Sequence, residues 1–193
     1  MPIFWLSSKG KIGAIWLVVL MALASTAAIA ADDALSPAAN AAWLAANAAK
    51  PGTITRASGL QYRVLRSGTG KRPSGDDLLR VSYTVRMING AVVDSTNPAL
   101  PQTISQTTIS MAGLAEALSL MHVGDRWQLA LPANLALGAK GAANGAVPPN
   151  QTLLFDMTLI SASPPAPGQA ATDNPFSVWS NGRENGASFT IRP

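Results

Sequence analysis

One predicted hairpin ends in an aspartate whose carboxylate could take part in binding or catalysis. Residues 81–96, VSYTVRMINGAVVDST, alternate between apolar and polar types, reach Asn89-Gly90, return through small apolar residues and end just beyond Asp94. The alternation predicts a half-buried strand, and Asn-Gly is a strong hairpin signal. Asp94 has two interpretations, because aspartate also favours turns on its own chemistry. It either caps the turn or projects into an apolar pocket beside Tyr83, which is itself either pocket wall or strand core.

The residue types exclude most other kinds of catalytic site. The chain has no cysteine and a single histidine, His122, so it offers no disulfide, thiolate or multi-histidine metal site. No phosphate-binding loop follows a predicted strand, no serine occupies a nucleophile elbow, and the ten acidic residues are scattered. We interpret His122 as a polar residue of the turn before Gly124, and we expect neither a metal nor a cofactor. What remains is an apolar pocket with a few polar groups at its edge.

Length and charge limit the kinds of partner that the protein could bind. The 193 residues leave room for one globular domain plus tails. Net charge is +4, but the acid-free segment 1–30 carries two of the lysines, and without it the charge falls to +2. No cluster of lysine and arginine resembles a nucleic-acid footprint, so we expect no nucleic-acid partner.

The first 30 residues have the organisation of a signal peptide. Lys9 and Lys11 precede the apolar run IGAIWLVVLMALA, and AIA at 28–30 is a small-x-small cleavage site. We expect cleavage, a periplasmic or secreted location and no membrane association afterwards. The alternative is an uncleaved N-terminal membrane anchor, since residues 12–31 are nearly long enough to span a bilayer.

Local patterns predict the elements that position these residues. Residues 36–50 are typical of a helix that Ser36 caps, that Pro51-Gly52 ends, and that packs through Trp43 and Leu44. Alternating or helical spacing further predicts strands at 59–65, 79–88, 91–93, 127–131 and 151–160 and a helix at 111–121.

Together these elements predict an α+β fold. An antiparallel β-sheet wraps around one short α-helix, preceded by a short N-terminal helix and followed by an extended C-terminal tail. We expect four parts: a signal peptide at 1–30, the N-terminal helix at 31–52, the pocket-bearing domain at 53–162, and a Pro-rich linker and tail of unassigned role at 163–193.

Four motifs resemble, in order and spacing, those of FKBP-type peptidyl-prolyl cis-trans isomerases, and most closely the exported bacterial branch. They are ASGLQYRVLRSGTG (57–70), VSYTVRMINGAVVDST (81–96), GLAEALSLMHVGDRWQLALP (113–132) and VPPNQTLLFDMTLI (147–160). The resemblance covers roughly residues 43–161. It implies an FKBP-like domain at 53–162 that isomerises Xaa-Pro bonds without a cofactor.

The resemblance also implies roles for individual residues. Tyr83 of the second strand, Asp94 after the hairpin and Phe155 of the last strand match the catalytic lining of the family's pocket. Met111, before the central helix, and Val147, in the long loop before the last strand, match residues that bind substrate at its flanks.

Four further substrate-binding positions depart from the family pattern. Val93 replaces a phenylalanine, Leu114 the tryptophan of the pocket floor, Leu137 a tyrosine before glycine, and Ile104 an aromatic residue of the intervening strand. Each exchange keeps an apolar surface but removes ring area, and one aromatic side chain buries about 150–250 Å². We therefore expect a wider, less well-shaped pocket and a loss on the order of 1–3 kcal/mol of transition-state binding for each lost wall.

Two functions remain in competition. The first is an exported isomerase that assists the folding of proline-containing polypeptide clients by stabilising the twisted Xaa-Pro amide in an apolar pocket. The alternative is a non-catalytic peptide-binding or chaperone module on the same fold, with a depleted aromatic pocket. A weaker third hypothesis has residues 176–179 covering the pocket in cis. In each case we expect a monomer, because the N-terminal helix is short.

Overall fold

The computed structural model describes residues 34–97, 99–142 and 145–166. Seven strands form one antiparallel sheet in the order β1-β2-β6-β7-β3-β4, and β5 pairs with the other end of β3. The elements are α2 (Pro37–Ala48), β1 (Ile54–Thr55), β2 (Gln61–Arg66), β3 (Leu78–Met87), β4 (Val92–Ser95), β5 (Gln102–Ser105), α3 (Ala112–Leu120), β6 (Arg126–Leu131) and β7 (Leu153–Ser163), with 3-10 turns at Gln106–Thr108, Ala133–Leu135 and Gly138–Lys140.

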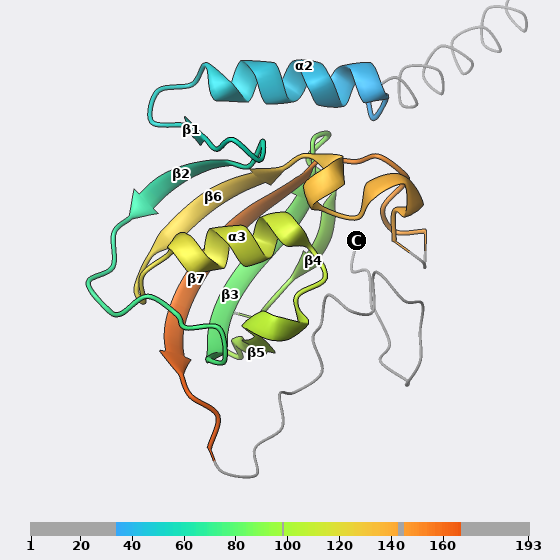
Figure 1. The fold of residues 1–193 in the computed structure, drawn as a ribbon. Helices are drawn as coiled ribbons and strands as arrows, with labels where there is room; N and C mark the ends of the chain where they lie inside the picture. The colour runs from blue at the N-terminus through green and yellow to red at the C-terminus, as the bar shows by residue number, and fades with distance from the viewer. Residues whose placement is uncertain (1–33, 98, 143–144, 167–193) are drawn as a thin grey trace, which may run out of the picture.

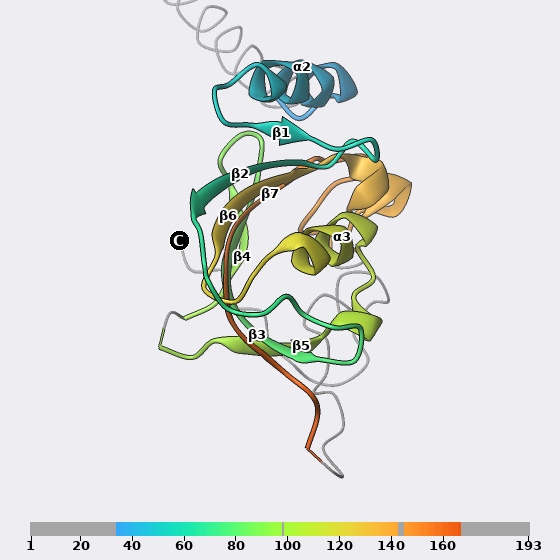
Figure 2. The same ribbon diagram turned by 60° about the vertical axis from the view of Figure 1, so that its left-hand side comes forward.

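The sheet curves around α3, as the two views in Figures 1 and 2 show, while α2 lies outside the curve. This confirms the predicted α+β fold with one helix inside an antiparallel sheet. We call the side that faces α3 the concave face and the opposite side the convex face. The predicted hairpin joins β3 to β4, and Gly90 has a φ of +87°, a left-handed conformation that glycine adopts without steric cost.

The core lies between the concave face and α3. In the sheet register Phe155 pairs with Val85 on one side and with Leu129 on the other, so the three side chains share this face. All three are at most 2 % exposed. Helix α3 contributes Leu114, Ala117 and Leu118, which are fully buried.

Helix α2 follows the predicted capping but is attached in an unexpected way. Ser36 Oγ accepts a hydrogen bond from Ala39 N at 3.1 Å, as its N-cap position requires. Trp43 and Leu44, the residues expected to pack the helix, are only half-buried.

Side-chain amides anchor α2 to the sheet instead. Buried Asn40 donates to Gln151 Oε1 at 3.1 Å and accepts from Thr152 N at 2.8 Å. Two turns further on, Asn47 donates to Gln61 Oε1 at 2.9 Å. The helix is therefore attached at two points, two turns apart, by hydrogen bonds of side-chain amides.

Candidate functional site

A tyrosine and a carboxylate meet at the concave edge where β3 faces β4. Tyr83 Oη donates a hydrogen bond to Asp94 Oδ2 at 2.8 Å, and Ser95 N donates to Asp94 Oδ1 at 2.8 Å. Tyr83 is 4 % exposed, whereas Asp94 is half-buried and reaches solvent. The sequence placed both residues in one pocket, and the structure brings them into direct contact.

Burial dominates the protonation of this pair. Desolvation raises the pKa of Asp94, although the hydrogen bonds from Tyr83 and from the Ser95 amide oppose the rise. Desolvation, followed by the neighbouring carboxylate, raises the pKa of Tyr83 well above its ordinary range. The tyrosine is thus a permanent hydrogen-bond donor, and it lacks the acidity for proton transfer near neutral pH.

Thr96, which was not among the predicted site residues, fixes the backbone beside this pair. Thr96 Oγ1 accepts from Tyr83 N at 2.9 Å, and Thr96 N donates to Tyr83 O at 2.9 Å. The strand end that carries Asp94 is thereby locked to the backbone of its partner. The available signal was the polar triplet DST after the hairpin, because threonine hydroxyls commonly bond to nearby backbone.

The apolar residues predicted for the pocket belong to the core or pack against it. Six of them belong to one continuous core cluster and are at most 4 % exposed: Tyr83, Ile104, Met111, Leu114, Val147 and Phe155. Val93 and Leu137 pack against that cluster and are half-buried. Of the nine predicted site residues, three are therefore partly accessible to solvent and form the rim, namely Val93, Asp94 and Leu137, and the other six form a buried floor.

The long loop before β7 supplies Val147 to this floor. Ala142 N donates to Val147 O at 2.9 Å, which closes the loop on itself. Gly141, at a φ of +64°, lies so close to Val147 O that a side chain at that position would collide with it. This part of the glycine-rich loop is thus a structural clamp.

The site offers hydrogen bonds and apolar surface. Among residues 34–97, 99–142 and 145–166, no group of three or more histidine, cysteine, aspartate or glutamate side chains lies close enough to hold a metal ion. His122 lies in the turn after α3, where its backbone N donates to Asp125 Oδ2 at 2.7 Å, as expected for a polar turn residue.

The site thus consists of a half-buried carboxylate that accepts a hydrogen bond from a tyrosine, at the edge of the apolar core of a sheet wrapped on one helix. Comparisons with known proteins identify the class further. A family model described as FKBP-type peptidyl-prolyl cis-trans isomerase matches residues 70–160, and another, described as the domain amino terminal to that isomerase, matches residues 18–64.

Individual relatives agree with the family models. Over 120 residues the chain is 42 % identical to the Outer membrane protein MIP of Legionella longbeachae, which covers 62 % of this chain and 51 % of that protein. Over 118 residues it is 39 % identical to the FKBP-type 22 kDa peptidyl-prolyl cis-trans isomerase of Escherichia coli K12, with 61 % and 57 % covered. The chain thus spans about half the length of the curated relatives it matches.

Solved structures give the same result. The peptidyl-prolyl cis-trans isomerase of Pseudomonas syringae pv. tomato superimposes with a TM-score of 0.61 at 31 % identity, covering 68 % of this chain and 95 % of that one. FkpA of Escherichia coli superimposes with a TM-score of 0.63 at 27 % identity, covering 81 % and 75 %. The chain belongs to the FKBP-type peptidyl-prolyl cis-trans isomerase family.

Proposed function

We propose that this protein is a peptidyl-prolyl cis-trans isomerase that acts on proline-containing polypeptides through the concave-face pocket. The observation that carries the proposal is the 2.8 Å hydrogen bond between Tyr83 and Asp94 at the edge of the apolar floor that includes Phe155. It joins two residues to which the family resemblance gives catalytic roles, and Phe155, the third, belongs to the same core cluster as Tyr83.

The chemistry needs no nucleophile. An Xaa-Pro bond interconverts slowly because its conjugated amide must twist, at a barrier of roughly 20 kcal/mol. The twisted amide has lost conjugation and is less polar, so an apolar surface that holds the proline ring binds it better than the planar form. In this proposal Asp94 orients the amide from the rim, Tyr83 fixes the carboxylate, and Phe155, Val147 and Met111 provide apolar surface.

A second candidate is a peptide-binding module without catalysis. It is favoured by the four aliphatic exchanges, because Leu114 and Ile104 are fully buried and present no ring to a substrate. Val93 and Leu137 give the rim aliphatic surface where the family has aromatic rings. Such a pocket can hold a proline ring while discriminating weakly between planar and twisted amides.

Exchange NMR on short Xaa-Pro peptides distinguishes the two functions. We expect the purified protein to speed cis-trans exchange, and Asp94→Ala to reduce that rate about 10- to 100-fold, the equivalent of 1–3 kcal/mol. The matched control is Asp76→Ala, which removes an exposed loop carboxylate and the same charge. Peptide binding without acceleration, in a folded protein, would establish the non-catalytic module.

The organisation around the domain is proposed on sequence grounds. We propose export through the signal peptide at 1–30, the domain division at 31–52, 53–162 and 163–193, and a monomer that binds no nucleic acid. Residues 1–33 and the segment 176–179, which was the hypothetical cover in cis, lie outside the described residues. Of the described part of the chain, neither helix has the length and apolar composition that crossing a bilayer requires.

Two measurements test this organisation. N-terminal sequencing of protein recovered from the periplasm should begin at Ala31, and light scattering coupled to gel filtration should give a monomer mass. Retention of residues 1–30 would support the membrane anchor instead.

A further inference from the structure

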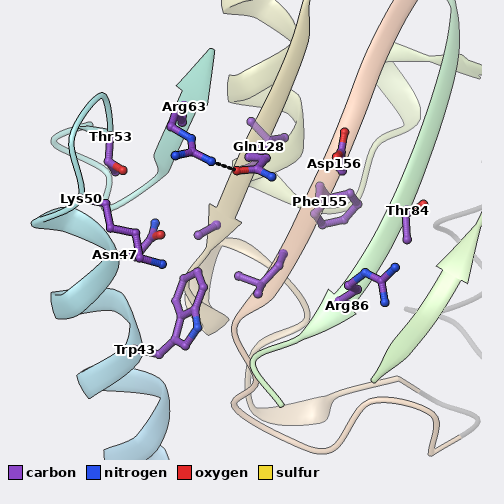
Figure 3. A pocket seen from close by; sticks show the side chains of 13 residues that line it. Trp43, Asn47, Lys50, Thr53, Arg63, Thr84, Arg86, Gln128, Phe155 and Asp156 are labelled. Atoms are coloured by element: carbon purple, nitrogen blue, oxygen red, sulfur yellow. Dashed lines mark hydrogen bonds between the residues drawn. The ribbon is translucent and has the colours of Figure 1, made fainter. Parts of the chain in front are cut away.

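A groove of about 250 Å³ lies on the convex face, between α2 and the outer surface of the sheet, opposite the isomerase pocket. Figure 3 shows its walls: Trp43 projects from α2 and Lys50 from the turn that follows it, and Arg63, Arg86 and Asp156 project from strands β2, β3 and β7. Asn47, one of the residues that anchor α2, is also part of the lining of the groove.

The charge in this groove is unbalanced. Lys50 Nζ lies 5.1 Å from the centre of the Trp43 ring, Arg63 donates to Gln128 Oε1 at 2.7 Å, and Arg86 donates to the backbone oxygen of Gly90 at 3.3 Å. None of these three cations forms an ion pair with another described residue.

The groove's own carboxylate does not offset these cations. Asp156 is the one acidic side chain among the described residues that line the groove. It accepts two hydrogen bonds from Arg126, each 2.8 Å long, so its charge is already matched. Three cations around the groove therefore remain available to anions from outside.

The groove also has apolar surface. Leu154 and Ala130 form part of its floor, and the Trp43 ring forms a wall. A ligand that uses both features carries carboxylates, which match the planar fork of arginine, and an aliphatic or aromatic side chain between them. The apolar part of the lining disfavours a ligand of continuous negative charge such as nucleic acid, and the recessed position between helix and sheet disfavours a flat lipid surface.

We propose that the groove between α2 and the convex face of the sheet is a docking site for acidic polypeptide segments that carry an apolar residue. Carboxylates of the segment pair with Arg63, Arg86 and Lys50, and its apolar side chain packs against Trp43 and Leu154. The site is separate from the isomerase pocket, and it does not depend on whether that pocket catalyses isomerisation.

Fluorescence anisotropy with the full chain tests the proposal directly. The probe is a labelled, proline-free peptide of repeated Glu-Glu-Leu units, which gives the isomerase pocket no proline to bind. We expect saturable binding that weakens as salt rises from about 50 to about 500 mM, because screening weakens exposed charge pairs. The lysine counterpart, made of Lys-Lys-Leu units, should not bind.

Charge variants locate the site. Arg63→Gln with Arg86→Gln should weaken binding about tenfold, the loss expected for removing charge-assisted hydrogen bonds. The matched control, Arg72→Gln with Arg80→Gln, removes the same charge from exposed positions outside the groove and should change affinity less than about twofold. Asp156→Asn should tighten binding about threefold, a gain that loss of a merely structural contact does not produce.

Several results of these binding measurements would overturn the proposed docking site. Absence of binding, or equal loss in both double variants, would overturn the proposal. Tighter binding of a thymidine oligonucleotide or of phosphatidylglycerol vesicles through Arg63 and Arg86 would overturn it in favour of a polyanion or a membrane surface. Isomerisation of Xaa-Pro peptides should be unchanged in all these variants, so a failure here is distinguishable from a failure of the catalytic proposal.

Discussion

The two faces of the sheet use successive residues of the same strand for opposite purposes. On β3, Tyr83 and Val85 face α3 and are at most 4 % exposed, whereas Thr84 and Arg86 line the groove under α2. The concave face carries buried apolar side chains that pack against α3, and the carboxylate of Asp94 lies half-buried at its rim. The convex face carries cationic side chains, and side-chain amides attach α2 over it.

This difference between the faces indicates that the concave face stabilises the fold and that the convex face is available for binding. Apolar burial on the concave face holds the sheet to α3, and each large side chain removed there leaves a cavity. The convex face contributes little apolar burial. Its side chains can therefore serve binding at little cost to the stability of the fold. Substitutions on the concave face should therefore lower the free energy of unfolding more than substitutions on the convex face.

The largest separation should come from one substitution on each face. Phe155→Ala should lower the free energy of unfolding by about 3–5 kcal/mol, because it leaves a cavity in the centre of the sheet. Arg86→Ala, on the opposite face, should change it by about 0.5 kcal/mol or less. Urea unfolding followed by circular dichroism measures both, and similar losses would refute the contrast between the faces.

The polar anchor of α2 should have the next largest effect. Asn40→Ala removes four hydrogen bonds and leaves Gln151 and Thr152 N without their partner, at a cost of about 2–4 kcal/mol. Amide hydrogen exchange should show α2 opening while α3 stays protected. Asn134→Ala, at an exposed position, is the control. Uniform loss of protection across both helices would mean that α2 is part of the core.

A tight contact between α3 and the concave face gives a smaller effect. A Cβ at Gly113 would lie 2.9 Å from both Leu131 Cγ and Leu135 Cβ. Gly113→Ala should destabilise the fold by about 1–2 kcal/mol, because overpacking exceeds the gain in helix propensity. Gly75→Ala, where a Cβ meets no atom within 4 Å, should be neutral or slightly stabilising. Thermal unfolding of the two variants checks this, and a stabilised Gly113→Ala would show that the helix can move away.

The smallest effect concerns the rim carboxylate and depends on pH. Since burial raises the pKa of Asp94, the folded form holds its proton to higher pH than the unfolded form does. The free energy of unfolding should therefore fall as pH rises from about 4, the ordinary aspartate value, through the raised pKa. Asp94→Asn should abolish that fall and leave the variant slightly more stable than wild type at pH 7.

Urea midpoints at a series of pH values measure this. Asp76→Asn, at an exposed position, should keep the wild-type profile. An Asp94→Asn profile parallel to wild type would mean that the carboxylate is as well solvated in the fold as in the unfolded chain.

Sequence patterns predicted those features that depend on neighbouring residues. Ser36 as N-cap, the Asn89-Gly90 hairpin and the helix before His122 were all correct, because capping, turn chemistry and apolar spacing act over a few residues. For the same reason Tyr83 and Asp94 could be placed in one region, since a single hairpin joins them.

Features built from distant residues could not be predicted in the same way. The anchor of α2 joins Asn40 to Gln151, and polar residues at irregular spacing give no periodic signal. The groove on the convex face is lined by residues as far apart in the sequence as Trp43 and Asp156, so it was missed too. The contact of Tyr83 with Asp94 needed the register of β3 on β4, including the irregularity after Val85, which the sequence does not encode as a pattern.

The position of β7 has a consequence for how the protein is made. It is the last strand among the described residues, yet it lies between β6 and β3 in the middle of the sheet. A ribosome that adds roughly 5–20 residues per second takes on the order of ten seconds to reach Leu153. Until then β3 and β6 remain open edges that invite aggregation. A stop codon shortly before Leu153 would therefore abolish folding. A molecular chaperone that binds the nascent chain until β7 has been made would raise the yield of folded protein.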